Sequence, residues 1–322
     1  MADSTAETEI KLAVGFGDFV RRFQVEALGV NGRTVRLSET LDHAFRKHDY
    51  PAQLKGMLSE TMVLTAGLSK SLKFEGVFTL QVQGDGPVGL MISDVTANGG
   101  IRAYARCQTD RIEAALRKPG SLLPKLMGAG HMALTVDPGN DMDRYQGIVE
   151  LQGSSLSECV QTYFRQSEQL ETAIVVASEP EPADGPPRAA AIMIHRLPGK
   201  SETAADREAD DDNWRRAVAL LSSVTASEML DNRLAVTELL FRLYHEDGVR
   251  VFKPKPLRHA CRCSRQKVVT TLVSFPREEI EDMAENGAVV VTCEFCGTRF
   301  PFPLSEFDHL FGNHQGVEPV AP

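Results

Sequence analysis

Four cysteines between residues 261 and 296 constrain the C-terminal part of this chain more than any other feature. Cys261 and Cys263 form a CxC pair, Cys293 and Cys296 form a CxxC pair, and 29 residues separate the two pairs. Tetrahedral four-sulfur zinc sites are built from two such ligand pairs joined by a longer loop. The spacing therefore predicts that the chain folds back so that all four cysteines hold one Zn2+ ion.

The sequence between the two pairs indicates how they meet. Pro276 and the glutamates after it predict the start of a short helix. Residues 288–293, AVVVTC, predict a strand that leads into a turn, and Gly297 eases the backbone there. Four thiolates fill the coordination shell, so the zinc is expected to be structural. Three nearby histidines are then expected to face solvent: His259, His309 and His314.

The metal is expected to control the folding of a small module, residues 257–322. Structural zinc contributes about 10 to 16 kcal/mol in zinc-finger peptides, whereas whole domains are stable by only about 5 to 15 kcal/mol. Metal-bound thiolates are deprotonated, and accessible ones can react with peroxide or hypochlorite. A CxxC disulfide closes with modest distortion, whereas a CxC disulfide forms a tight ring. Neither is compatible with four-thiolate zinc binding.

Composition limits the class of protein. The 322 residues exceed what one core usually holds, so at least two folded units are expected. The N-terminal sequence shows no secretory pattern and no apolar run is long enough to span a bilayer, so a cytoplasmic protein without a membrane partner is expected. In that reducing compartment clustered thiols favour a metal site. The net charge of -9 argues against nucleic acid as a partner.

Residues 1–198 are predicted to form a mixed sheet-and-helix domain, which makes the chain an α+β protein. Alternating segments around Asn31-Gly32 and Asp85-Gly86-Pro87 predict two hairpins, and Pro51 opens a segment with apolar residues at helical spacing. The proline-rich residues 179–187 predict a long loop before an apolar strand.

Residues 199–256 are predicted to be a helical linker. Its acidic first part, residues 201–212, is expected to be solvated and poorly ordered. Residues 214–246 carry an apolar stripe at helical spacing, and Thr225 to Glu228 is a possible capping box. The stripe is expected to pack on the first domain; the alternative is that it becomes exposed under some conditions.

Longer stretches of sequence carry a resemblance that covers nearly the whole chain. Besides the CxC and CEFCG motifs, these stretches are DFVRRFQVEALGVNGRTVRL, SLKFEGVFTLQVQGDGPVGLM, RYQGIVEL, YFRQSEQLETAI, IHRLPG and RLYHEDGVRVF. In them the chain resembles the 33-kDa heat-shock protein family, the redox-regulated holdase chaperones also called 33 kDa chaperonin.

The resemblance implies a two-state chaperone. In the reduced state Cys261, Cys263, Cys293 and Cys296 would hold zinc and the chaperone would be inactive. Oxidation would form the Cys293–Cys296 and Cys261–Cys263 disulfides, release zinc and disorder the linker. Exposed apolar surface would then bind unfolding client proteins without ATP, and the oxidised protein would be a homodimer. The resemblance gives no role to Cys107 or Cys159, which are expected to be buried structural thiols.

Other functional classes fit the sequence less well. A thiol oxidoreductase would use the CxxC pair, but no helix is predicted to begin there to activate a thiol, so no enzyme is expected. GDGPVG lacks the Gly-Lys-Ser/Thr of a phosphate-binding loop and predicts a hairpin turn. A nucleic-acid-binding zinc ribbon would fit the metal site, but basic and aromatic residues are not interleaved.

Overall fold

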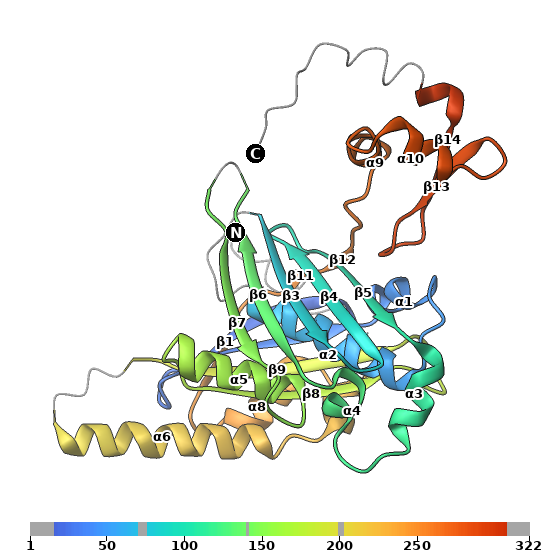
Figure 1. The fold of residues 1–322 in the computed structure, drawn as a ribbon. Coiled ribbons are helices and arrows are strands. Elements are labelled where there is room, and N and C mark those ends of the chain that lie inside the picture. Colours follow the sequence, from blue (N-terminus) through green and yellow to red (C-terminus); the bar gives the residue numbers. More distant parts are fainter. Residues whose placement is uncertain (1–15, 70–75, 140–141, 199–202, 308–322) are drawn as a thin grey trace, which may run out of the picture. The chain divides into compact units, whose positions relative to one another are not determined.

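The computed structural model describes residues 16–69, 76–139, 142–198 and 203–307. The chain divides into two compact units, Met1–Ala260 and Cys261–Pro322. Two six-stranded sheets and several helices build the first unit, and a two-stranded sheet with short helices builds the second (Figure 1). The predicted α+β class is confirmed.

The first sheet of the first unit is antiparallel and has the strand order β10-β1-β2-β9-β8, with β11 also beside β1. Its central pair joins β2 to β9 over eight residues of each strand, from Val30 paired with Arg196 to Leu37 paired with Ala189. Its strands are β1 (Phe19–Val25), β2 (Val30–Leu37), β8 (Thr172–Glu179), β9 (Arg188–Arg196), β10 (Val249–Val251) and β11 (Lys255–Pro256). The predicted loop at residues 179–187 connects β8 to β9.

The second sheet has the strand order β12-β5-β4-β3-β6-β7, in which only the short β12 runs parallel to its neighbour. The predicted hairpin at Asp85-Gly86-Pro87 is confirmed, because these residues connect β3 to β4. The strands are β3 (Val77–Gly84), β4 (Val88–Thr96), β5 (Gly100–Cys107), β6 (Gly130–Asp137), β7 (Tyr145–Glu150) and β12 (Arg258–His259).

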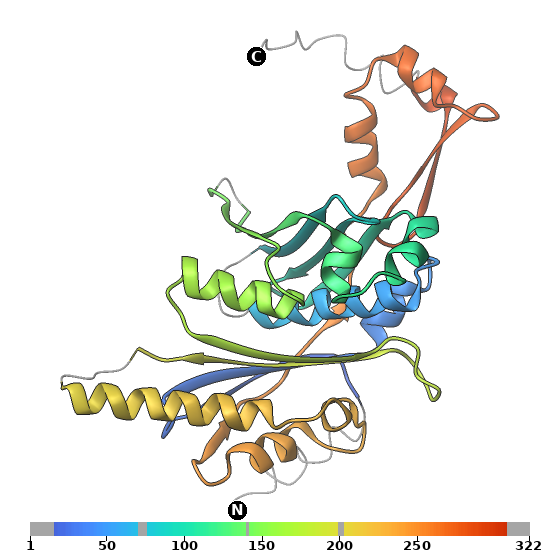
Figure 2. The same cartoon turned by 60° about the horizontal axis from the view of Figure 1, so that its bottom comes forward.

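Helix α2 (Ala52–Ser69) lies between the two sheets and confirms the helix predicted after Pro51 (Figure 2). It is buried on nearly all sides, so its hydroxyl groups need partners within the helix. Thr61 and Thr65 donate to carbonyl oxygens four residues earlier, at 2.8 and 2.6 Å. A Cβ atom at Gly67 would lie 2.2 Å from Met193 Cε, so glycine lets β9 approach closely. Smaller helices complete this unit: α1 (Glu39–Phe45), α3 (Thr109–Leu116), α4 (Leu122–Met127) and α5 (Leu156–Ser167).

The predicted linker region forms three helices that cover the other face of the first sheet (Figure 2). They are α6 (Ala204–Ser222), α7 (Ala226–Leu230) and α8 (Val236–Tyr244). The predicted capping box is present, with Thr225 and Glu228 exchanging side-chain to backbone hydrogen bonds at the start of α7. Leu239 and Leu240 of the apolar stripe are buried against the sheet. The first unit therefore consists of sheet, helix, sheet and linker layers.

The turn predicted at Asn31-Gly32 is wrong. Both residues lie inside β2, and the chain reverses instead at residues 26–29, where the Gly29 amide donates to the Glu26 carbonyl at 3.1 Å. Gly32 is needed for packing, because a Cβ atom there would lie 2.0 Å from the ring of Phe23. The glycine thus allows a close approach between β1 and β2 where a turn was expected.

The disorder predicted for the acidic segment is wrong for its described part, residues 203–212. Thr203 and Asp206 form a capping box that starts α6. Acidic residues in the first turn also stabilise a helix, because they interact favourably with the positive end of its dipole. An ion pair of 2.6 Å between Arg196 and Asp211 joins the helix to the end of β9. The segment is solvent-exposed, as expected, yet helical; residues 199–202 lie outside the described part.

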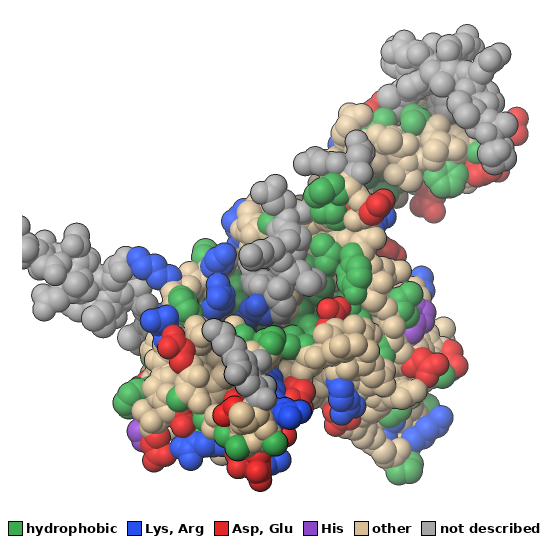
Figure 3. Space-filling model, turned by 90° about the vertical axis from the view of Figure 1, so that its left-hand side faces the viewer, with side chains coloured by type: hydrophobic (Ala, Val, Ile, Leu, Met, Phe, Trp, Pro, Cys, Tyr) green, Lys and Arg blue, Asp and Glu red, His purple; other side chains and the backbone are tan. Residues whose placement is uncertain are grey.

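Cys159 is buried, as predicted, whereas Cys107 is half-buried at the end of β5, so the prediction for Cys107 is wrong. Of the helices within the described ranges, none combines the length and hydrophobicity of a membrane-spanning segment. On the face of the first unit seen in Figure 3, acidic and basic side chains are interspersed, which leaves this face without a large patch of one charge.

The second unit is small. Its elements are α9 (Arg265–Leu272), α10 (Arg277–Asp282), β13 (Ala288–Thr292) and β14 (Arg299–Pro303). The helix after Pro276 and the strand before Cys293 were predicted, but α9 was not. Its described core contains five buried side chains: Leu272, Ile280, Val289, Phe302 and Phe307.

Candidate metal centre

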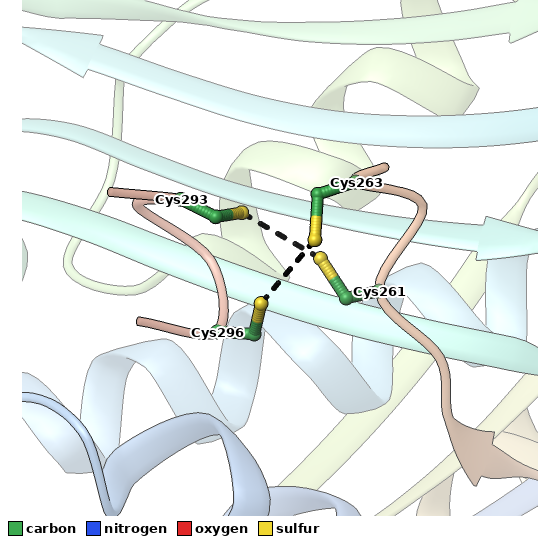
Figure 4. Close-up of side chains that lie close together, drawn as sticks. All are labelled: Cys261, Cys263, Cys293 and Cys296. Atoms are coloured by element: carbon green, nitrogen blue, oxygen red, sulfur yellow. Dashed lines mark hydrogen bonds between the residues drawn. The ribbon is translucent and has the colours of Figure 1, made fainter. Parts of the chain in front are cut away.

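The second unit brings the four cysteines of the CxC and CxxC pairs together. Cys261 and Cys263 lie on the extended segment that leads into α9, and Cys293 and Cys296 lie on the turn between β13 and β14. Their side chains point toward one common centre (Figure 4). The sulfur atoms of Cys261 and Cys293 are 3.7 Å apart, those of Cys263 and Cys296 are 3.5 Å apart, and all four lie within 4.8 Å of one another.

The turn that carries the CxxC pair is held by backbone hydrogen bonds. The Cys293 amide donates to the Thr298 carbonyl at 2.9 Å, and the Gly297 amide donates to the Cys293 carbonyl at 2.8 Å. Gly297 has a φ of +66°, which glycine adopts without strain. The fixed turn directs both sulfur atoms to the same side.

The sulfur positions fit a zinc ion. Zn–S bonds of about 2.3 Å in a tetrahedron separate the sulfur atoms by about 3.8 Å. Two of the sulfur–sulfur distances, 3.7 and 3.5 Å, are close to that value. Among the described residues these cysteines are the group of side chains whose ligand atoms can hold a metal ion. The identity of the ion as zinc and the ligand assignments remain predictions.

The surroundings shift the pKa values of Cys263, Cys293 and Cys296 in different directions. Burial opposes ionisation of Cys296, but hydrogen bonds from the Thr298 hydroxyl and amide outweigh it and lower the pKa of Cys296 to about 7. Burial raises the pKa of Cys263 and also that of Cys293, although the Cys296 and Phe295 amides favour the Cys293 thiolate. Amide and hydroxyl donors therefore already compensate part of the negative charge that four thiolates would bring.

All four sulfur ligands are only half-buried. Within the second unit Cys263 borders an open hollow of about 210 Å³ whose walls include Val268, Leu272 and Val291. A thiolate at such a surface is within reach of small dissolved oxidants.

Basic side chains near the cysteines make different contacts. Arg265 lies over the Phe302 ring at 4.1 Å and donates to the Pro301 carbonyl at 2.8 Å, so it supports the core of the second unit. Lys267 is closer to the ligand segment, where its ammonium group donates to the Arg262 carbonyl at 3.0 Å.

The histidines are not brought into the cysteine cluster in the described part of the chain. His259 was expected to face solvent, but it is half-buried and stacks on His43 with ring centroids 5.0 Å apart. Burial and the nearby His43 lower the pKa of His259. His309 and His314 lie outside the described residues.

The family model described as Hsp33 protein matches residues 18–303, which is most of the chain and includes all four clustered cysteines. The chain belongs to the Hsp33 family. The family resemblance of the sequence is therefore confirmed.

Two relatives place this Hsp33 chain among proteins named 33 kDa chaperonin. One from Caulobacter vibrioides is 39% identical over 285 residues, 87% of this chain and 92% of the relative. One from Escherichia coli is 33% identical over 303 residues, 94% of this chain and 98% of the relative.

A solved Hsp33 homologue from Thermotoga maritima, titled 33 kDa chaperonin, has a similar fold. Its TM-score is 0.76 at 20% sequence identity, with 92% of this chain and 98% of the other chain covered. At this identity the likeness shows the fold alone.

Sequence reasoning missed one part of the centre. Thr298 donates to Cys296 from both its hydroxyl and its amide. The position of Thr298, two residues after Cys296, could have predicted this role. Backbone amides in a CxxC turn point toward the cysteine sulfur, and hydrogen bonds to a thiolate favour it.

Proposed function

We propose that this chain is a redox-regulated, ATP-independent holdase chaperone. In the reduced state Cys261, Cys263, Cys293 and Cys296 would hold Zn2+, and the chaperone would be inactive. On oxidation the zinc would be released, the second unit and the linker would lose their order, and apolar surface would bind unfolding proteins during oxidative and heat stress. The cluster of four cysteine sulfur atoms within 4.8 Å of one another, inside a very small unit, is the single observation that carries this proposal.

Oxidation is chemically incompatible with the metal centre. Each disulfide forms an S–S bond from two thiols and loses two electrons and two protons, which reduce one peroxide molecule to two water molecules. Closure of Cys293–Cys296 or Cys261–Cys263 removes two of the four thiolate ligands. Because every sulfur lies within 4.8 Å of the others, either disulfide requires only local movement.

Loss of the metal is expected to unfold the second unit. Its described core has five buried apolar side chains, whereas a structural zinc contributes about 10 to 16 kcal/mol in small domains. A core of this size does not replace that contribution.

The linker provides the surface that would be uncovered. Its helices share an apolar cluster with the first sheet, including Leu239, Leu240 and Tyr244 from α8 and Phe23 and Ile192 from the sheet. Release of the helices would expose both sides of this cluster to water. Large exposed apolar patches are typical of surfaces that bind other proteins.

The remaining parts of the proposal concern partners and compartment. The partners would be unfolding polypeptides bound without ATP, and oxidised protein would form a homodimer. We propose no catalytic turnover, no nucleic-acid partner and a cytoplasmic location, where thiols stay reduced until stress.

One titration tests the proposal. Purified reduced protein is treated with increasing hydrogen peroxide at mildly raised temperature, and zinc release, thiol loss and suppression of client aggregation without nucleotide are followed together. The three quantities are expected to change in parallel. Full aggregation suppression by the reduced, metal-bound protein would contradict the switch.

Peptide mapping of the oxidised protein tests the disulfide pairing. The expected products are Cys293–Cys296 and Cys261–Cys263. The sulfur atoms of Cys261 and Cys293 and those of Cys263 and Cys296 are only 3.7 and 3.5 Å apart, so these crossed disulfides are the specific alternative.

A further inference from the structure

An arginine is buried beneath the linker. Arg36 of β2 is only 3% exposed and lies on the sheet face that the linker helices cover, the same face as Val30 and Gly32. Its guanidinium lies over the Phe16 ring, 4.8 Å from the centroid. The Nη2 atom is buried, and no hydrogen-bond partner is found for it in the described part of the chain.

A buried guanidinium without a carboxylate is unusual, because buried charges are normally paired. Among the described residues none forms an ion pair with Arg36. Burial lowers the pKa of Arg36 to about 10, so it stays charged at neutral pH. The nearby linker carboxylate of Asp231 opposes that shift, yet its Oδ1 accepts hydrogen bonds from Arg233 instead.

The surroundings of Arg36 combine apolar and cationic groups. Arg36 pairs across the sheet with Phe19 of β1. Arg21, two residues along β1 on the same face, lies over the Phe19 ring at 5.6 Å and also has a buried Nε without a partner in the described structure. The same face also carries the buried hydroxyl residue Thr34 and apolar side chains that include Phe23, Val25, Val30, Ile192 and Ile194. One end of an apolar face thus carries two arginines with unused donors.

The linker segment that covers this face is apolar and carries an acidic residue, so its composition complements an apolar face with two arginines. From α7 through α8 it buries several apolar side chains in the shared cluster: Met229, Leu234, Val236, Leu239 and Leu240. It also brings Asp231 near Arg36 without making the ion pair. The linker segment on this face is therefore apolar with one acidic residue. Within the described residues it forms no hydrogen bond with Nη2 of Arg36.

We propose that the sheet face under the linker binds client segments that carry an acidic side chain within an apolar stretch, and that Arg36 recognises the carboxylate. The inference rests on the proposed chaperone function and specifies the class of segment that it selects. Once the linker leaves, the guanidinium can donate two parallel hydrogen bonds to a carboxylate in an otherwise apolar site, where such bonds are strong. A neutral client segment would leave Arg36 without an ion pair, as it is when the linker covers the face.

A pair of peptides tests the selectivity. Oxidised, zinc-free, full-length protein is titrated against a fluorescently labelled apolar peptide with one central glutamate and against the same peptide with glutamine. The glutamate peptide is expected to bind about tenfold more tightly, a difference of about 1.4 kcal/mol. Arg36→Met is expected to abolish this ratio, and the exposed Arg250→Met on β10, which removes the same charge, is expected to retain it.

The outcomes separate two failures. If wild-type protein binds neither peptide and does not suppress aggregation, the proposed function itself fails. If it binds both peptides equally, or if Arg36→Met keeps the preference, only the selectivity inference is overturned. The readout is the ratio of the affinities for the glutamate and glutamine peptides. A variant that only alters linker release changes both affinities together and leaves this ratio unchanged. Arg36→Lys keeps the charge but not the paired donors, and a reduced ratio in it supports the assignment even if the methionine variant folds poorly.

Discussion

Cysteines in this chain differ in reactivity because their surroundings differ. Cys159 donates to the Gln152 carbonyl at 3.6 Å inside the core of the first unit, and burial raises its pKa to about 11. Cys296 receives hydrogen bonds from Thr298 at a half-buried turn, and its pKa is lowered. Cys296 therefore ionises more readily than Cys159, whose burial protects it from oxidation.

Replacing one clustered thiol should disrupt the second unit. Cys293→Ser removes one of four predicted ligands, so zinc content under reductant is expected to fall at least tenfold, with the second unit partly unfolded. Metal analysis and hydrogen exchange over residues 261–307 measure both effects. Cys107→Ser is the matched control, since Cys107 lies on β5 outside the cluster, and it should leave metal content unchanged. Full zinc binding by Cys293→Ser would refute the ligand assignment.

His195 should make the first unit sensitive to acid. It is 7% exposed, its Nδ1 lies 2.8 Å from the Thr172 hydroxyl, and burial with the nearby Arg33 lowers its pKa from 6.5 to about 4. Between those values the unfolded chain binds a proton that the folded unit does not, so stability falls as pH decreases through this window. The loss from pH 7 to 4.5 is about 2 to 3 kcal/mol.

Urea unfolding followed by circular dichroism at the two pH values checks this effect. His195→Gln should remove that part of the pH dependence, whereas the exposed His245→Gln should retain it. Equal pH dependence in wild type and His195→Gln would contradict the assignment.

Local patterns predicted which cysteines come together, but not the buried charges. The CxC and CxxC spacings lie within short segments, so their chemistry is readable before the fold is known. Arg36 sits in the ordinary alternating sequence TVRL, and its burial results from linker helices that are distant in the sequence. Burial by distant elements cannot be read from such a segment.

At the scale of secondary structure elements, apolar packing and an ion pair hold the linker helices on the first sheet. Buried side chains of α7 and α8 join the apolar cluster of the first sheet, and the Arg196–Asp211 ion pair joins α6 to β9. Arg196 is 24% exposed on its side chain, so the ion pair contributes little in salt solution. The apolar contacts therefore provide most of the stability of linker docking.

Removing one apolar contact should release the linker without oxidation. Leu240→Ala leaves a cavity at a position that is 0% exposed, at a cost of about 2 to 5 kcal/mol. Partial suppression of client aggregation by the reduced, zinc-bound protein is expected, with faster hydrogen exchange over residues 214–246. The neighbouring Phe241→Ala is the control, since Phe241 is 60% exposed and should change neither quantity. Unchanged activity in Leu240→Ala would argue against linker release as the switch.

Elements with a local signal were predicted correctly. The β3–β4 hairpin follows from its Asp-Gly-Pro turn, and α2 follows from its proline start and apolar spacing. The turn at Asn31-Gly32 was mispredicted because that glycine serves the packing of Phe23. The start of α6 was mispredicted because an acidic composition suggests disorder, while the Thr203 capping box favours a helix.

At the scale of the whole molecule, the two units depend on different stabilising terms. The first has a large apolar core that spans two sheets and the helix between them, whereas the second has five buried apolar side chains in its described part. The first unit should therefore be stable without metal, and the second should not.

Chelation separates the two units experimentally. A strong zinc chelator added under reductant should unfold residues 261–307 and leave the two sheets of the first unit folded. Hydrogen exchange is expected to become fast in α9, α10, β13 and β14 and to remain slow in β2, β3, β4 and β9. Added zinc should restore protection. Uniform loss of protection in both units would show that they fold as one.

Three very short strands carry the chain from α8 to the first cysteine. β10, β11 and β12 have three, two and two residues, and few backbone bonds hold them, such as Leu257 to Asp18 at 2.9 Å and Ala260 to Ile101 at 3.0 Å. A pulling force applied at Cys261 acts on the backbone hydrogen bonds of these short strands one after another, not on all of them together. Mechanical pulling on the tail should therefore detach this stretch in small steps at low force, long before the long central strands yield.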